Sequence, residues 1–246
     1  MLQDDCQKNC KVNSEVFEYV FNAVPFKGDT AAYNRQLGIA HFEFLAEKID
    51  LGLADLSFYI LAFYLKCSSA LPYHISEACF VSGLSQALSP DDKVSPENEY
   101  AGAFRALRSA VRKTHHQILH NEVDLIKFYN FLYMWCLRNN RASDRTTVAM
   151  ELWELFFTED SSSMECDNYK HYVCFRNLRN WIAFVGTNSF AENFSISADL
   201  WHQLFYFAKL ESYETYSTSD SWPLALDSFV EWSKQGQSEE NNMERY

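Results

Sequence analysis

Three carboxylates recur at helical spacing in the stretch TSDSWPLALDSFVEW (218–232). Steps of seven and four residues return to nearly the same side of a helix, so Asp220, Asp227 and Glu231 share one face and apolar side chains lean to another. Asp199, in the first turn of the preceding helical segment, can extend this acidic face. Carboxylates that border apolar surface can steer and orient a partner rich in Lys or Arg. The pattern is also typical of a solvated helix face, and a carboxylate in a first turn stabilises its own helix.

Three histidines in THHQILH are the second candidate for chemistry. His116 and His120 are four residues apart, so both rings can reach one metal ion from the same helix face, and His115 is adjacent. No neighbouring Glu or Cys completes a known ligand pattern, and no HExxH occurs. The cluster also fits a polar helix face that binds nothing.

Motifs for covalent or phosphate chemistry are missing from the sequence. No GxSxG elbow and no GxxxxGK[ST] loop occurs, and no carboxylate pair stands beside a partner base. A calcium loop is also excluded, since Ala31, Tyr33 and Arg35 fill the ligand slots before Gly38 and the DxDxDG pattern is absent. We therefore expect a protein without cofactor or metal that acts by binding.

The composition predicts long helices to position these residues. Gly and Pro together make up 12 of the 246 residues, which is too few for a fold full of tight turns. Apolar residues recur at helical spacing in ten segments, with Ser14, Ser76 and Ser197 as caps, Gly186 as a stop and Pro223 in a first turn. The expected helices are 14–24, 38–51, 53–67, 76–88, 103–120, 124–140, 145–157, 172–186, 198–210 and one from 223 onward.

The fold class is thus all-α, in two packed halves that divide between residues 85 and 125. The Pro- and acid-rich stretch SPDDKVSPENEYAG (89–102) is the clearest break. Residues 1–14 form a polar, flexible leader, and residues 235–246 form a polar tail that we expect to fray from Gly236 onward.

The net charge of the chain limits the kinds of partner that it can bind. A net charge of −12 argues against nucleic acid and against anionic membranes, and it suits a basic protein partner. No apolar run is long enough to span a bilayer, and the polar N-terminus is unlike a signal peptide. The seven Cys are scattered without a CxxC pair, which indicates reduced thiols and hence a cytoplasmic or nuclear protein.

The C-terminal third resembles the defective-in-cullin-neddylation family, whose shared unit is the potentiating-neddylation (PONY) domain. The resemblance is carried by ADLWHQLFYFAKL (198–210) and SWPLALDSFVEW (221–232), with its Trp-Pro pair, the aspartate four residues after Pro223 and the Phe-Val-Glu that follows. IKFYNFLYMW (126–135), VAMELWELFF (148–157) and LGIAHFEFLAEKIDL (37–51) match in order. It covers residues 15–234, with an N-terminal lobe over 15–120 and a C-terminal lobe over 121–234.

This resemblance implies a scaffold-type co-ligase with EF-hand-like, metal-free helix–loop–helix arrangements. Such a protein holds a cullin and the neddylation conjugating enzyme so that the modifier is transferred to a cullin lysine, and it forms no covalent intermediate. The family's acidic patch, which grips the basic winged-helix end of the cullin, maps to Asp199, Ser221 and Asp227, with Asp220 and Glu231 nearby. Ser221 stands where Ala is usual.

The resemblance also implies an apolar pocket for the acetylated N-terminal Met of the conjugating enzyme, which has lost its charge and is easily buried. The aligned residues, which any helical core would also contain, are Ile39, Phe42, Ala54, Phe58, Leu61, Leu65, Ile75, Phe80 and Trp135. Several are bulkier than usual, so the shape of the pocket differs. We expect a monomer without the ubiquitin-binding (UBA) module that many relatives carry.

Two alternatives stay open from the sequence. A divergent helical adaptor can keep this fold outside the pathway, and a metal-dependent enzyme can be built around His115, His116 and His120. Stoichiometric metal in the purified protein would favour the enzyme, whereas charge reversal at Asp199 and Asp227 separates the adaptor from the co-ligase.

Overall fold

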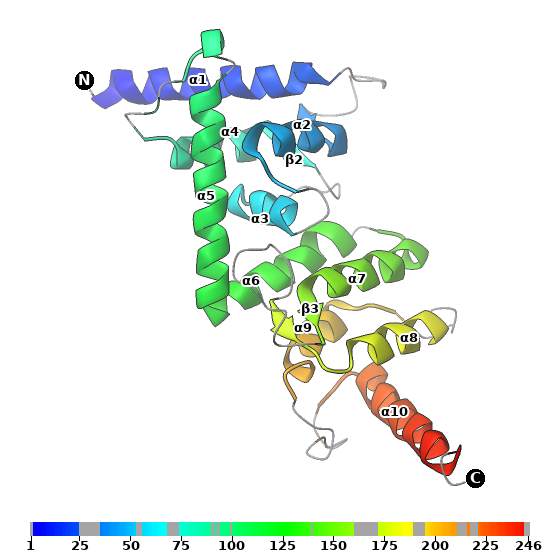
Figure 1. Cartoon of the computed structure of the whole chain (residues 1–246). Coiled ribbons are helices and arrows are strands. Elements are labelled where there is room, and N and C mark those ends of the chain that lie inside the picture. The colour runs from blue at the N-terminus through cyan, green and yellow to red at the C-terminus, as the bar shows by residue number, and fades with distance from the viewer. Residues whose placement is uncertain are drawn as a thin grey trace. The chain divides into compact units, whose positions relative to one another are not determined.

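The computed structural model describes residues 2–24, 35–52, 56–67, 74–89, 92, 94–98, 100–138, 140–159, 172–188, 195–210, 216 and 221–243. Over these residues the chain forms ten α-helices and only two pairs of two-residue strands, so the predicted all-α class is confirmed (Figure 1). No helix in this part of the chain is long and apolar enough to cross a bilayer. The chain divides into two compact units, residues 1–131 and 132–246.

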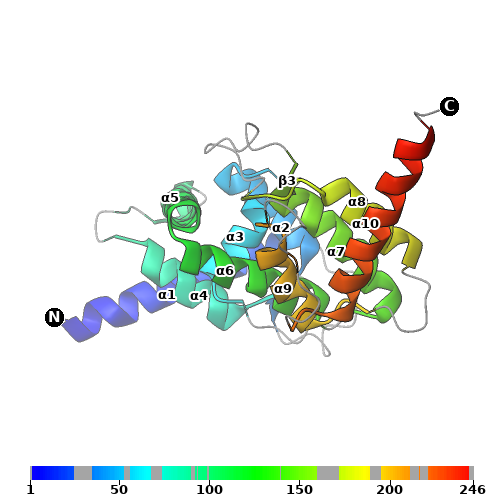
Figure 2. The same cartoon turned by 90° about the horizontal axis from the view of Figure 1, so that it is seen from below.

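The first unit repeats a helix–strand–helix pattern, and its two strands pair antiparallel with Gln36 opposite Ser76 and Leu37 opposite Ile75. The long helix α5 lies against α2, α3 and α4, as Figures 1 and 2 show, and α1 packs on α2 and α4. Its elements are α1 (Leu2–Ala23), β1 (Gln36–Leu37), α2 (Ile39–Ile49), α3 (Ser57–Tyr64), β2 (Ile75–Ser76), α4 (Glu77–Ala87), the 3₁₀ turn η1 (Pro96–Asn98), α5 (Ala101–His120) and α6 (Glu122–Leu132).

Close packing of α4 against the end of α3 depends on a glycine. A Cβ atom added at Gly83 would lie 2.2 Å from Leu65 Cδ2, well inside van der Waals contact. Leu65 and Leu84 are both buried there. The missing side chain at position 83 therefore allows the two segments to approach.

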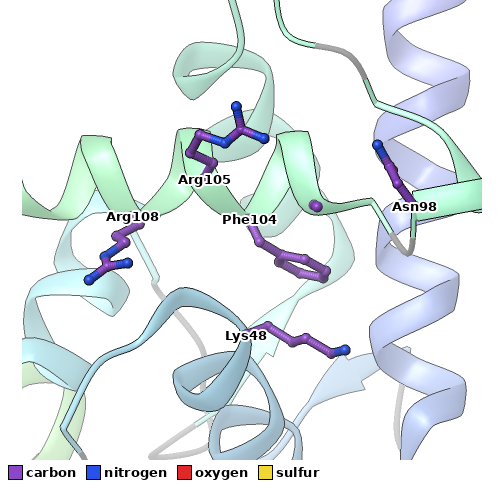
Figure 3. A pocket seen from close by; sticks show the side chains of 6 residues that line it. Lys48, Asn98, Phe104, Arg105 and Arg108 are labelled. Atoms are coloured by element: carbon purple, nitrogen blue, oxygen red, sulfur yellow. The ribbon is translucent and has the colours of Figure 1, made fainter.

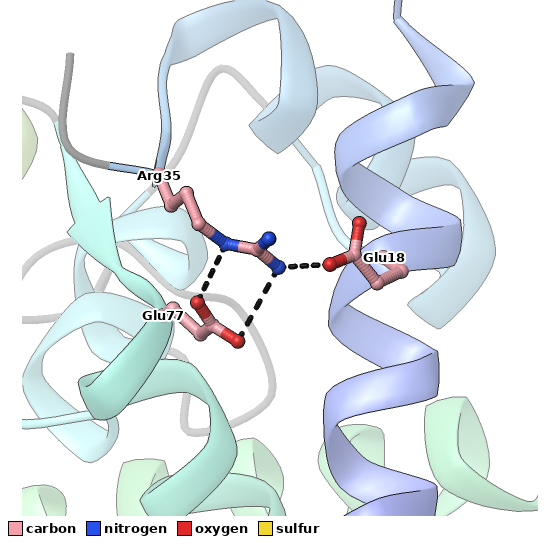
Figure 4. Close-up of polar contacts among 3 residues, drawn as sticks. All are labelled: Glu18, Arg35 and Glu77. Carbon is pink, nitrogen blue, oxygen red and sulfur yellow. Dashed lines mark hydrogen bonds and ion pairs between the residues drawn. The ribbon is translucent and has the colours of Figure 1, made fainter.

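An arginine joins the two helix–strand–helix repeats at the surface (Figure 4). Arg35 Nε donates to Glu77 Oε2 over 2.8 Å, and its Nη2 pairs with Glu18 on α1. The guanidinium also lies 5.7 Å from the ring centre of Phe17. Because solvent reaches all three side chains, each ion pair contributes only about 0.2–1 kcal/mol to stability.

At the start of helix α2, the side chain of His41 accepts the N–H of the capping residue Gly38, the role that Glu or Gln has in a capping box. The Gly38 N–H lies 3.2 Å from His41 Nδ1, and His41 Nε2 lies 3.2 Å from the Phe21 carbonyl oxygen. A neutral ring with its proton on Nε2 satisfies both contacts. Burial lowers the pKa of His41 below its ordinary value, which favours this neutral form.

The second unit is built on α7, which packs against α8, while α10 packs against both α8 and α9. Strands β3 and β4 pair in parallel, with Phe157 opposite Val173. The elements are a π-helical turn η2 (Tyr133–Leu137), α7 (Ala142–Phe156), β3 (Phe157–Thr158), β4 (Val173–Cys174), α8 (Leu178–Asn188), α9 (Ala198–Phe207) and α10 (Leu224–Met243).

Tryptophan dominates the core of the second unit. The Trp153 ring stacks on Trp201 with centroids 5.4 Å apart and meets Trp181 edge-on at 5.5 Å. All three are buried. All six tryptophans of the chain occur after residue 131, so the first unit contains none.

The helix starts agree with the sequence at two serine caps and one proline. The Ser76 hydroxyl oxygen accepts the Cys79 N–H over 3.3 Å, and Ser197 caps α9 in the same way. Pro223 immediately precedes α10, and its carbonyl oxygen accepts the Leu226 N–H. Two of the three predicted serine caps and the proline thus mark helix starts correctly, whereas Ser14 lies inside α1.

Most predicted limits shift by a few residues, and four differ in a way that changes the element. α1 begins at Leu2 instead of Ser14, and Asn13 in that stretch is buried with its Nδ2 donating to Ser85 Oγ on α4. α10 continues to Met243 through the expected polar tail. α8 passes Gly186, which has no positive φ, and ends at Asn188. The start of the predicted 172–186 helix is strand β4, because the Tyr172 N–H bonds the Phe156 carbonyl oxygen over 2.7 Å.

Candidate functional site

The acidic residues predicted near the C-terminus lie at the starts of two helices that pack against each other, α9 and α10. Ser197 Oγ accepts the Leu200 N–H over 3.0 Å and fixes the start of α9. Asp199 follows in the first turn and is exposed. Its carboxylate is therefore available to a partner, although the helix terminus also favours a negative charge there.

α10 presents the other acidic residues. Ser221 is exposed just before the helix, Asp227 is half-buried in its first turn, and Glu231 is exposed one turn further along. Tyr216 Oη donates a hydrogen bond to Asp227 Oδ1 over 2.5 Å. We call Asp199, Ser221, Asp227 and Glu231 the acidic surface. Asp220, also predicted for this site, lies outside the described residues.

An aromatic cluster supports the acidic surface. The Tyr216 ring stacks on Trp222 with centroids 5.9 Å apart, and both meet Phe207 of α9 edge-on. Phe207 in turn contacts Phe229 of α10 at 6.0 Å. These contacts hold the connection at residue 216 against both helices, and they orient the phenol that meets Asp227.

The acidic surface can bind cations and hydrogen-bond donors. Its carboxylates supply acceptor oxygens at the rim of an apolar cluster, a combination that suits a Lys or Arg side chain with an apolar neighbour. Its four residues offer no thiol, imidazole or amine. The chemistry that these residues support is recognition of a basic partner.

The residues predicted for the apolar pocket fall into three groups. Phe42, Leu61, Leu65, Ile75 and Phe80 are at most 2% exposed, so they are core residues of the first unit. Phe58 is half-buried with its ring 4.3 Å from that of Phe42, and Ile39 is 58% exposed at the first position of α2.

The other two predicted pocket residues are placed differently. Trp135 is buried in the second unit, and Ala54 lies outside the described residues. The pocket stays a prediction.

The three histidines do not share one face. His115 is buried, whereas His116 and His120 are exposed, with their rings stacked at 4.0 Å. His120 Nδ1 lies 2.8 Å from the His116 carbonyl oxygen. Within the described ranges, no group of three or more His, Cys, Asp or Glu residues can hold a metal ion. The arrangement brings together a pair and not a triad.

Sequence reasoning missed Tyr216 as part of the acidic surface. The residue lies in a connection, eleven positions before Asp227, and no periodicity links the two. It also missed a cavity lined by basic residues at the start of α5. A count of charges helix by helix would have found that feature, because α5 contains four Lys or Arg and no Asp or Glu.

Comparison with known proteins identifies the family. The family model described as "Cullin binding" matches residues 106–232, just over half of the chain. Defective in cullin neddylation protein 1 from Yarrowia lipolytica is 30% identical over 116 residues, which cover 46% of this chain and 41% of that protein. Defective in cullin neddylation protein AAR3 from Arabidopsis thaliana is 27% identical over 106 residues, which cover 42% and 30%. The matched segment thus spans less than half the length of either relative.

Both named relatives and the matched domain agree with the resemblance found from the sequence motifs, and the chain belongs to the cullin-binding family.

Proposed function

We propose that the protein is a scaffold-type co-ligase of cullin neddylation. It binds the basic C-terminal domain of a cullin through the acidic surface and binds the neddylation conjugating enzyme through the first unit. It promotes transfer of the modifier by holding both partners in a productive orientation, an effect that needs no covalent intermediate. The names of its relatives place those proteins in cullin neddylation and support this assignment.

One observation carries the proposal. Exposed Asp199 and half-buried Asp227 stand in the first turns of two helices that pack together, and both lie inside the segment that matches the cullin-binding family. Carboxylates that border an aromatic cluster are suited to a basic protein surface, since charge provides orientation and the apolar rim provides contact area.

The decisive experiment reverses these charges. Asp199→Lys combined with Asp227→Lys should weaken binding to a purified cullin C-terminal domain by about 100-fold, since close charge pairs at interfaces contribute a few kcal/mol. Binding is measured by isothermal titration calorimetry, with circular dichroism to confirm an unchanged helical content. The matched control, Glu151→Lys combined with Glu154→Lys, makes the same change of net charge at exposed positions of α7. Equal loss in both double variants would contradict the assignment.

The conjugating enzyme is assigned to the first unit with a specific requirement. Because the predicted pocket residues Phe42, Leu61 and Phe80 are fully covered by their own chain, the N-terminal Met must enter beside half-buried Phe58 and exposed Ile39. A peptide with an acetylated N-terminus should bind at least about tenfold more tightly than the free amine, because a buried unpaired ammonium is costly.

Phe58→Ala should remove that preference, whereas Val81→Ala, at a half-buried position of α4 outside the predicted set, should not. Tight binding of the unacetylated peptide would argue against an apolar pocket.

An in vitro assay of cullin modification tests the activity itself. Adding the protein should increase the initial rate of modifier transfer to the cullin, and Asp199→Lys with Asp227→Lys should abolish the increase. Cullin binding without any rate increase would instead support the divergent adaptor. The cullin contact should weaken with salt, while the Met contact should tolerate it, because the first depends on charge and the second on apolar burial.

A further inference from the structure

Helix α5 has a charge that opposes the rest of the molecule. It contains Arg105, Arg108, Arg112 and Lys113 and no acidic residue, in a chain with 33 Asp and Glu against 21 Lys and Arg. Exposed cations in such a chain have many carboxylates available as partners. A helix with four cations and no carboxylate therefore differs from the composition of the chain as a whole.

Three of the four cations make no ion pair in the part of the chain that the structure describes. Arg105, Arg112 and Lys113 are exposed and without such contacts, while Arg108 pairs with Asp50, whose side chain is 75% exposed. An ion pair that solvent reaches so freely is weak and easily exchanged. All four guanidinium and ammonium groups can thus be offered to a negatively charged partner.

A cavity of about 280 Å³ opens at the start of α5 (Figure 3). In the figure, Lys48 of α2 and Phe104 of α5 face each other, and Arg108 follows one turn along α5. Among the residues that the structure describes, no acidic side chain lines the cavity. Its lining residues are Lys48, Asn98, Ala101, Phe104, Arg105 and Arg108.

The backbone adds to the positive potential of this cavity. Tyr100 precedes α5 and makes no side-chain hydrogen bond to its first turn, and that turn holds no acidic residue. The positive end of the helix dipole is therefore not compensated by α5 itself. Three basic residues, Lys48, Arg105 and Arg108, line the cavity near this end of the helix.

The basic side chains extend beyond the cavity in a line. Arg105, Arg112 and exposed His116 are separated by seven and four residues, so they share one face of α5. At 1.5 Å per residue, the line from Arg105 to His116 is roughly 17 Å long. That length exceeds a single phosphate or carboxylate and matches several residues of an extended acidic peptide.

We infer that the first unit carries a docking surface for an acidic polypeptide segment of a protein partner. One carboxylate of that segment enters the cavity between Lys48 and Arg108, and the following acidic side chains meet Arg105, Arg112 and Lys113. We call these five residues the basic face. A nucleic acid is disfavoured as the occupant because the molecule as a whole carries a net charge of −12.

This inference does not rest on the proposed function. None of the five residues belongs to the acidic surface or to the predicted apolar pocket. A partner on the basic face can therefore be present whether or not the protein binds a cullin.

The test uses a fluorescein-labelled peptide of alternating Glu and Ser, about six residues long, because an extended chain rises roughly 3.3 Å per residue and must span the line of roughly 17 Å. Fluorescence anisotropy should show saturable binding to the full chain at low salt, and a peptide with Gln in place of Glu should not bind. Arg105→Glu combined with Arg112→Glu should weaken binding at least about tenfold, the effect of reversing two rim charges.

The control has the same net charge as the test variant. Lys11→Glu combined with Arg176→Glu reverses two exposed cations outside the basic face and should change the affinity less than about twofold if only screened, long-range charge is altered. A thermal melt followed by circular dichroism confirms that both double variants are folded. An additional change, Lys48→Gln, should weaken binding by removing the ammonium from the cavity.

Four results would overturn the inference. These are no binding of the Glu peptide, equal binding of the Gln peptide, equal loss in the two double variants, and binding of inorganic polyphosphate in place of the peptide. A fifth is concentration-dependent dimerisation in analytical ultracentrifugation that Arg105→Glu with Arg112→Glu abolishes. That result would make the occupant a second copy of this chain.

Discussion

The acidic surface and the basic face both lie at the beginnings of helices, but their charges relate to those helices in opposite ways. Asp199 and Asp227 stand in the first turns of α9 and α10, where a carboxylate stabilises the helix by itself. Arg105 and Arg108 follow the first turn of α5, which has no acidic residue and no side-chain cap. The helix dipole thus accounts for the carboxylates at the starts of α9 and α10, whereas it does not account for the cations near the start of α5.

This contrast shows when a cluster of charged side chains is evidence for a binding partner. Acidity at α9 and α10 would be present even in a protein that binds nothing, so the family match is needed to assign a partner. In the basic face, Arg105, Arg112 and Lys113 make no ion pair among the described residues, and the start of α5 gives no helix-dipole reason for a cation. The charge of the basic face is therefore informative without any relative.

The largest expected effect on stability concerns the aromatic cluster that supports the acidic surface. Phe229→Ala should lower the free energy of unfolding by about 3–5 kcal/mol, because it opens a cavity among Phe207, Trp181 and Phe184. Urea unfolding followed by circular dichroism measures the change, and Glu231→Ala on the exposed side of α10 should change it by less than about 0.5 kcal/mol. A small effect at Phe229 would show that the aromatic cluster does not support the acidic surface.

The next effect concerns the phenol at Asp227. Tyr216→Phe removes the hydrogen bond to Oδ1 and should lower the free energy of unfolding by about 1 kcal/mol. Tyr206→Phe removes a phenol from an exposed ring of α9 and should have no measurable effect, which makes it the matched control. If both substitutions behave alike in thermal unfolding, Asp227 is held by its own helix and not by Tyr216.

The smallest effects test the contrast directly. Ala101→Glu should stabilise the protein by about 0.3–1 kcal/mol, since it supplies the missing negative charge at the start of α5, and Asp199→Ala should destabilise it by a similar amount. Ala101→Gln separates charge from helix propensity, and both charge effects should shrink in high salt. Ala101→Glu should also weaken binding of the acidic peptide. A destabilising Ala101→Glu would mean that this terminus is already compensated.

Local signals predicted most of the fold. Ser76 and Ser197 marked helix starts because a hydroxyl satisfies first-turn N–H groups, a rule that needs only a few residues. Gly186 failed as a stop because glycine permits a left-handed end without requiring one, and here it stays helical. Residues 173–174 failed because their backbone partners, Phe157 and Thr158, come from a distant segment.

The acidic surface was predicted only in part, because only some of its contacts come from residues close together in the sequence. The spacing of Asp227 and Glu231 is local, so periodicity gives it, whereas the pairing of α9 with α10 and the phenol of Tyr216 come from tertiary packing. Five predicted pocket residues are buried core, because apolar side chains that line a pocket and those that fill a core have the same pattern in a sequence.

The uneven placement of tryptophan gives each unit its own optical signature. Emission excited where only indole absorbs reports on the second unit alone, while far-ultraviolet dichroism reports on the helices of both. Coincident melting curves from the two signals would mean that the units unfold as one cooperative block, and separated curves would give each unit its own transition. Tryptophan fluorescence therefore separates the unfolding of the second unit from that of the first without an added label.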